Sequence, residues 1–139
     1  GFNKKLAATA QNAGVENFGK FQNYGYRGLY NGENASDIKK RKKLTKNQDI
    51  LDHMGSTELA ANYFRITQTE EKLRNENIQG EDNANITHYK VGKIVRNTIK
   101  EIGGTMPEDL PTPEKSIKEL EKEYKKEKLP EKHKLPKEE

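Results

Sequence analysis

The chain has 139 residues, of which 35% are charged and 30% are hydrophobic, so its core must be small and its surface heavily solvated. It contains no Cys, which excludes a disulfide framework, a zinc–thiolate site and a cysteine nucleophile. The formal net charge is +4, but residues 1–50 hold ten Lys and Arg residues against four Asp and Glu residues. Any polyanionic partner is therefore expected to prefer the first third of the chain.

The first 31 residues predict two helices. Residues 3–13 contain four alanines and are followed by Gly14, which predicts a short helix with a glycine stop. Residues 17–31 hold five of the ten aromatic residues of the chain, with glycines between them. The spacing of these aromatic residues predicts a helix that is loosened by glycine and ends near Gly28 or Gly32.

The next segment predicts two shorter elements. Ser36 and Asp37 are placed to cap a basic helix over residues 37–44, with the sequence DIKKRKKL. Residues 49–54 predict another short helix or turn, which leads into a longer helix.

Residues 54–74, MGSTELAANYFRITQTEEKLR, have the rhythm of a bacterial helix-turn-helix motif. That motif needs a small residue on its first helix, a residue that accepts a tight turn four positions later, and an apolar residue about six positions after that. Taking Ala61 or Ala60 as the small residue puts an arginine or a phenylalanine in the turn and a glutamate on the inward side. We therefore predict one continuous helix over residues 56–77. Its apolar face is predicted to consist of Leu59, Tyr63, Ile66 and Leu73, with Ala60 and Phe64 beside them.

A second long helix is predicted over residues 87–102, after a loop at residues 77–85 with Gly80 at its centre. Its apolar side is predicted to consist of Val91, Val95, Thr98, Ile99 and Ile102. No alternating strand pattern is present, so the predicted fold class is all-α. We expect a small irregular helical domain at residues 1–111, in which two long helices pack through their apolar stripes and the first third of the chain wraps them.

The C-terminal segment predicts a charged amphipathic helix and a tail. Thr112 and Pro113 supply a cap and a first-turn proline for a helix over residues 113–128, within a segment at 112–129. Residues 130–139 are expected to be disordered. The helix carries a narrow apolar stripe that could pair with a second copy, so a homodimer is one hypothesis, beside docking within the chain and plain exposure. The stripe consists of Ile117, Leu120 and Tyr124.

The histidines give little support for catalysis. His53 follows Asp52 directly, and neighbouring residues on a helix point about 100° apart, so such a pair rarely converges on one ion. A metal site would need His53 and His88 brought together with a carboxylate such as Glu58. Because no nucleophile motif, phosphate-binding loop or metalloprotease pattern is present, we expect no catalytic residue, no metal and no cofactor. A divalent-metal nuclease or hydrolase that uses these residues is the alternative.

The strongest local signal for a ligand is the basic run at residues 39–43, which lies downstream of the aromatic segment. Cations that follow phosphates, together with tyrosines that stack on bases, bind single-stranded nucleic acid without reading its sequence. The alternative is that the run is a solvated helix end and that the tyrosines fill the core. The candidate nucleic-acid-binding set consists of Lys39, Lys40, Arg41, Lys42, Lys43, Lys46, Arg27, Tyr26 and Tyr30.

Four long phrases resemble, in the same order, the C-terminal half of the bacterial DNA-damage-inducible protein D family. They are NKKLAATAQNAGV, FQNYGYRGLY, ILDHMGSTELAANYFRITQTEEKLR and THYKVGKIVRNTIKEIGGTMPEDLPTPEKSIKELE, and the resemblance covers residue 3 to about residue 121. It implies a non-enzymatic regulator of the SOS response that modulates RecA-type recombinase filaments on single-stranded DNA, by contact with protein and, through the basic set, with DNA. It also implies a bacterial, cytoplasmic protein that joins the nucleoid when bound to DNA and has no membrane partner.

Members of this family carry an upstream domain similar to the N-terminal module of phage and baculovirus BRO antirepressors. This chain opens on Gly1 without an initiator Met, so we expect that it is a fragment of a longer protein. A further alternative follows from that organisation. This half would then only bind protein or dimerise, while the N-terminal domain binds DNA.

Overall fold

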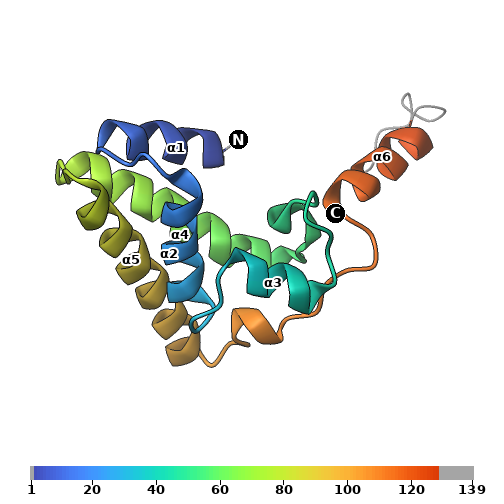
Figure 1. The fold of residues 1–139 in the computed structure, drawn as a ribbon. Helices are drawn as coiled ribbons and strands as arrows, with labels where there is room; N and C mark the ends of the chain where they lie inside the picture. The colour runs from blue at the N-terminus through green and yellow to red at the C-terminus, as the bar shows by residue number, and fades with distance from the viewer. Residues whose placement is uncertain (1, 129–139) are drawn as a thin grey trace.

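The computed structural model describes residues 2–128. In that range the chain forms six α-helices, two short 3-10 helices and no strand, which confirms the all-α class. The elements are α1 (Phe2–Asn12), α2 (Phe18–Leu29), α3 (Ala35–Lys42), η1 (Ile50–His53), α4 (Ser56–Asn75), α5 (Glu81–Ile102), η2 (Pro107–Asp109) and α6 (Ile117–Lys128). Figure 1 shows α4 and α5 joined at one end and diverging from there, with α2 alongside α5 and α6 extending away from the other helices. None of these helices is long and apolar enough to cross a membrane.

The helix α4 is continuous, which confirms the single-helix prediction and leaves no turn for a helix-turn-helix motif in this segment. Its buried face differs from the predicted one. Ile66 and Leu73 are buried, but Tyr63 and Phe64 are 48% and 53% exposed. Polar residues spaced four, three and four positions apart lie on the inward face instead. These are Glu58, Asn62, Arg65 and Thr69.

The helix α5 begins at Glu81, whereas the sequence predicted a loop there and a helix only from residue 87. Gly80 has a φ angle of 97°, which lets the chain reverse between α4 and α5. The carboxylate of Glu81 accepts hydrogen bonds from the backbone N–H groups of Glu16 and Asn17, at 3.0 and 2.9 Å. A contact with such a distant part of the chain fixes the start of the helix, and the local pattern of polar residues could not reveal it.

The predicted cap of α3 was displaced by a few residues. Asn34, not Ser36, is the N-cap: its side chain accepts from the Asp37 N–H at 2.9 Å, and the Asp37 carboxylate accepts from the Asn34 N–H at 3.0 Å. The helix ends before Lys43, which has a φ angle of 60°, so Leu44 lies outside the helix. The basic run therefore spans a helix end and the loop that follows it.

The predicted cap of α6 was wrong for a similar reason. Ser116 and Glu119 form a reciprocal capping box, in which the Glu119 N–H donates to Ser116 Oγ at 3.0 Å and Glu119 Oε1 accepts from the Ser116 N–H at 2.7 Å. The helix consequently starts at Ile117 rather than at Pro113. The Thr112 hydroxyl, predicted to be the cap, instead accepts a hydrogen bond from Lys42.

Two apolar clusters form the core, one at each half of α2. The first joins α2 to α1, α4 and the start of α5, through Leu6, Ala10, Ala13, Val15, Phe21, Ile66, Leu73 and Ala84. The second joins it to α3, η1 and the middle of α5, through Tyr26, Leu29, Tyr30, Ile38, Ile50, Met54, Val91 and Val95. Leu59 and Ile99 are only partly buried against this second cluster, and Ile102 is 78% exposed. The predicted stripes therefore contribute only in part, and α2 packs on α5 more extensively than α4 does.

Glycines allow α2 and α5 to cross at very short range. A Cβ atom on Gly28 would lie 2.2 Å from the backbone oxygen of Tyr89, and one on Gly92 would lie 2.7 Å from the backbone oxygen of Gly25. Neither distance is possible for a real side chain, so both positions need glycine. The glycines of α2 were predicted to loosen the helix, and in the structure two of them, Gly25 and Gly28, bring its backbone against α5.

The C-terminal segment is attached through a few polar contacts. Asp52 of η1 accepts a hydrogen bond from the backbone N–H of Lys118 at 2.9 Å, and Ser116 is buried. Along α6, Leu120 and Tyr124 are 49% and 59% exposed. The boundary placed at 111/112 stays a prediction, and the tail predicted to be disordered, residues 130–139, lies outside the described residues.

Candidate nucleic-acid interface

The two candidate tyrosines are core residues. Tyr30 is fully buried and Tyr26 is 5% exposed. The hydroxyl of Tyr30 donates to Glu58 at 2.5 Å and accepts from Asn62 at 2.9 Å. Burial, and then the charge of Glu58, raise the pKa of Tyr30, so the phenol remains neutral. Neither ring presents a face to solvent. Both tyrosines fill the core, as the alternative interpretation of the sequence expected.

Lys42, a member of the candidate nucleic-acid-binding set, is buried, so for this residue both the DNA-contact prediction and the solvated alternative are wrong. Its Nζ atom lies 2.7 Å from Glu58 Oε1, in an ion pair whose two side chains are 0% and 1% exposed. The same ammonium donates to the backbone oxygen of His53 at 3.1 Å and to Thr112 Oγ1 at 3.2 Å. All three of its N–H bonds are therefore used inside the protein, and none is left for a phosphate.

Among the other cations of the candidate set near Lys42, some side chains are bound within the protein and others are exposed to solvent. Arg41 forms a forked pair with Glu33, with N–O distances between 2.9 and 3.2 Å. That hydrogen bonding raises the pKa of Arg41. Lys39 donates to the backbone oxygen of Lys46 at 2.8 Å. The side chains of Lys40, Lys43 and Lys46 are exposed.

A second buried cation, Arg65, was missed by the sequence reasoning. It is 2% exposed, and its guanidinium donates to Asn62 Oδ1 at 3.0 Å and to His88 Nε2 at 2.6 Å. Because a guanidinium only donates, His88 Nε2 must accept, and the proton of the neutral ring lies on Nδ1, which donates to the Phe21 carbonyl at 2.9 Å. The ring of Tyr26 lies 4.8 Å from the Arg65 guanidinium carbon.

These contacts form one continuous buried chain that runs from Lys42 through Glu58, Tyr30, Asn62 and Arg65 to His88. It joins α2, α3, α4 and α5. All six side chains are buried, so this buried chain of contacts holds the helices together and offers no surface to a ligand. Buried polar residues recur on α4 with helical spacing, which is the signal that a scan for apolar residues overlooks.

The side chains of the alternative hydrolase site each make hydrogen bonds with different partners in the fold. His53 makes a ring contact with the Asp49 carbonyl at 2.9 Å, and Asp52 accepts from α6. Glu58 and His88 belong to the buried chain described above. Among residues 2–128, no group of three or more His, Cys, Asp and Glu side chains is arranged to hold a metal ion.

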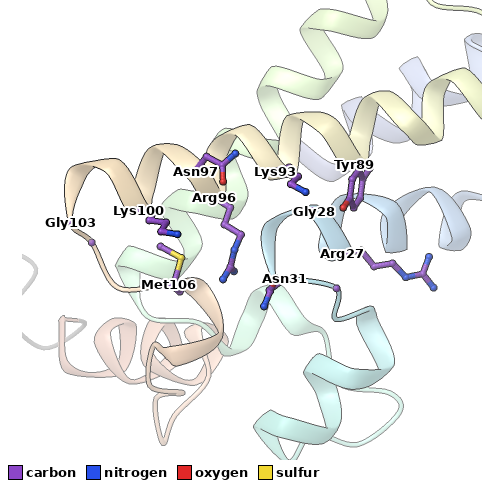
Figure 2. A pocket seen from close by; sticks show the side chains of 12 residues that line it. Arg27, Gly28, Asn31, Tyr89, Lys93, Arg96, Asn97, Lys100, Gly103 and Met106 are labelled. Atoms are coloured by element: carbon purple, nitrogen blue, oxygen red, sulfur yellow. The ribbon is translucent and has the colours of Figure 1, made fainter.

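The surface does contain a basic pocket, which lies between the end of α2 and the C-terminal half of α5 (Figure 2). Its volume is about 690 Å³, within the range of small-ligand and nucleotide sites. Figure 2 shows Lys93, Arg96 and Lys100 in a row along α5, opposite Gly28 and Asn31. Tyr89, Arg27, Asn97 and Met106 also line it, with glycines 32, 103 and 104.

The lining of this pocket holds four cations and no carboxylate. Arg96 is held in place by Glu108, with two N–O distances of 2.7 and 2.8 Å, and donates to the backbone oxygen of Leu29 at 3.1 Å. The pair raises the pKa of Arg96 and lowers that of Glu108. Within the described part of the chain, Lys93 and Lys100 form no ion pair.

Only one of the nine candidate residues, Arg27, belongs to this pocket. The α5 residues of the pocket were missed, although their spacing is visible in the sequence. Tyr89, Lys93, Arg96 and Lys100 follow one another at intervals of four, three and four positions, so they share one helix face. That face lies opposite Arg27 only because glycine brings α2 against α5.

Comparisons with known proteins assign most of the chain to one family. A family model described as the DinD C-terminal domain matches residues 1–120. The chain belongs to the DinD C-terminal domain family. The match extends from α1 to the first residues of α6, so the matched range includes the basic pocket and the buried polar chain.

A curated relative gives the same assignment. DNA damage-inducible protein D of Escherichia coli (strain K12) is 59% identical to this chain over 126 residues. The alignment covers 88% of this chain and 46% of the relative, so the chain spans about half the length of that protein. No solved structure matches the chain.

Proposed function

We propose that this domain acts in the bacterial DNA-damage response as a non-enzymatic regulator that contacts recombinase filaments on single-stranded DNA. The observation that carries the proposal is the 59% identity to DNA damage-inducible protein D over 88% of this chain. At that level of identity the two domains share their fold. We therefore assign this domain to the response to DNA damage after which the relative is named.

The filament as target comes from the family resemblance, and the surface chemistry of the domain is consistent with it. A recombinase filament presents both protein and the phosphates of a single strand. The described surface carries exposed cations along α5, in the basic pocket, which attract such a polyanion. We therefore propose contact with the filament as the mode of action, in the cytoplasm and at the nucleoid.

A pulldown tests the proposal. The domain is immobilised and incubated with a RecA-type recombinase and a nucleotide that supports filament formation, with and without single-stranded DNA. We expect recombinase to be retained when the single strand is present and to be released when a nuclease digests it. The rate at which recombinase leaves labelled single-stranded DNA, measured with and without the domain, reports modulation. Equal recovery on empty beads, with an unchanged release rate, contradicts the proposal.

The non-enzymatic part of the proposal has its own test, against a divalent-metal hydrolase. Asp52, His53, Glu58 and His88 make contacts with different partners in the fold, which supports a structural role for each. We expect the chain to leave labelled DNA intact in Mg²⁺ or Mn²⁺. The half-buried ring of His53 can be removed without opening the core. Metal-dependent cleavage that disappears in His53→Ala would show that the chain is a nuclease and not a non-enzymatic regulator.

A further inference from the structure

We propose that the basic pocket between α2 and α5 binds the backbone of single-stranded DNA, with Arg27, Lys93 and Lys100 on the phosphates and a base stacked on Tyr89. The choice of a single strand rests on the proposed function, whereas the phosphate chemistry rests on the pocket itself. The pocket shares one residue with the set expected from sequence and lies mainly on a different helix.

The first argument is the charge of the lining. Arg96 is occupied, because Glu108 binds its guanidinium at two points. Arg27, Lys93 and Lys100 have no carboxylate within ion-pairing distance in residues 2–128. These three cations line the same concave surface, and the neighbouring carboxylate of Glu108 is already bound to Arg96. The surface therefore keeps a positive potential, which bound phosphates would relieve.

The second argument is what the pocket offers beside charge. The ring of Tyr89 is half-buried, and Lys93 Nζ lies 5.8 Å from its centre. A ring fixed in this way can take a base, while the neighbouring cation reaches the phosphate of the same nucleotide. Asn31 and Asn97 add exposed amides that can donate to phosphate or base edges.

The shape favours a single strand over a duplex. A volume of about 690 Å³ accommodates one nucleotide with its flanking phosphates. In a duplex the bases are paired and stacked on the inside, so a base could reach Tyr89 only after it had been flipped out, at a cost of several kcal/mol. A single strand can turn one base outward at much lower cost.

The test measures binding of a fluorescent oligothymidylate to the chain by anisotropy over a range of salt concentrations, without recombinase. With three phosphate contacts, log K against log salt should have a slope of about −2 for the parent. Lys93→Gln combined with Lys100→Gln should leave a slope of about −0.7 and reduce affinity about 25-fold at 0.1 M salt. Tyr89→Leu should reduce affinity about tenfold and leave the slope unchanged.

A matched control separates the pocket from general attraction by the basic first third. Lys40→Gln combined with Lys46→Gln removes the same charge from exposed side chains of the basic run. We expect this variant to keep the parent slope. An equal loss in both double variants, or displacement of the label by a duplex as readily as by a single strand, would overturn the pocket as the binding site.

Two further measurements keep the result decisive. Circular dichroism melting confirms that each variant is folded, and amide chemical shifts of the parent titrated with oligothymidylate should change first at residues 89–104. Shifts confined to α3 would contradict the proposal. If the chain holds the recombinase filament but no free strand, the pocket inference fails and the proposed function stands. If it holds the strand through the pocket but leaves filaments unaffected, the proposed function fails and the pocket stands.

Discussion

Arg65 is a buried cation whose polar side-chain partners are neutral groups, Asn62 and His88. The only carboxylate of the buried chain, Glu58, is already paired with Lys42. The buried chain therefore contains two cations and one anion. The Arg65 Nε atom has no hydrogen-bond partner among the described residues, and the ring of Tyr26 supplies part of the missing stabilisation. Burial lowers the pKa of Arg65, and the cost of this charge must be met by the packing around it.

The neutral state of His88 makes the stability of the protein pH-dependent. Burial, and then the charge of Arg65, hold the pKa of His88 well below its usual range, so the folded state resists protonation, whereas the unfolded state takes up a proton near pH 6.5. The free energy of unfolding should therefore be highest above pH 6.5 and fall between pH 6.5 and 5, by up to about 1.4 kcal/mol per pH unit. Urea unfolding at several pH values measures it. His88→Gln should lose this slope, and a parent that is equally stable at pH 5 and 7 would contradict the assignment.

The Lys42–Glu58 pair predicts a large effect from a small change. Glu58→Gln leaves the buried ammonium of Lys42 without its counter-charge, and breaking a buried pair in this way costs about 3–5 kcal/mol. Thermal and urea unfolding measure the loss. Lys40→Gln, an exposed neighbour in the same run, is the control and should change stability by less than about 0.5 kcal/mol. Similar small effects from both variants would show that Lys42 is solvated.

Among the elements, the crossing of α2 and α5 controls the architecture of both the core and the pocket. The close approach allows Gly28 to line the pocket and sets Arg27 opposite the cationic face of α5. A wider crossing would separate the two sides of the pocket. The fold and the candidate site therefore depend on the same glycines.

Gly28→Ala tests this crossing. The added methyl group would lie 2.2 Å from the backbone oxygen of Tyr89. A backbone oxygen cannot move aside as a flexible side chain can, so the two helices must separate. We expect this to lower the free energy of unfolding by about 1–3 kcal/mol. Gly19→Ala on the same helix is the matched control: its nearest neighbour would be the Asn17 side chain at 3.6 Å, so it should stabilise the helix by about 0.5–1 kcal/mol. Melting temperatures of the two variants that shift in the same direction would contradict the close crossing.

Local patterns predicted the helices, and long-range contacts decided the features that the sequence could not predict. The continuity of α4 follows from the absence of Gly and Pro inside it, and this can be read directly from the sequence. The start of α5 depends on Glu81 binding residues 16 and 17, and the burial of Lys42 depends on Glu58, each pair being well separated in sequence. The cationic face at Lys93 and Lys100 could have been predicted from its spacing, but its position opposite Arg27 could not.

At the scale of the whole molecule, the described chain consists of a packed helical body and one helix with few contacts. The core clusters involve α1 to α5 and η1, whereas α6 touches the body mainly at η1. The side chains from 118 to 127 are all exposed. An isolated helix of 12 residues is marginal in water, so α6 depends on its capping box and on the Asp52 contact for its stability.

Hydrogen exchange should reveal this difference directly. Amides in the middle of α2 and α5 should exchange only through global unfolding, because they lie at the helix crossing between the two core clusters. Amides at residues 120–127 should exchange through local fraying, with protection lower by several orders of magnitude. Asp52→Ala should lower it further, while Asp82→Ala, an exposed carboxylate in the first turn of α5, should leave α6 unchanged. Strong protection of α6 that grows with protein concentration would mean that a second copy covers Leu120 and Tyr124, as the homodimer hypothesis requires, whereas strong protection independent of concentration would contradict the weak attachment of α6.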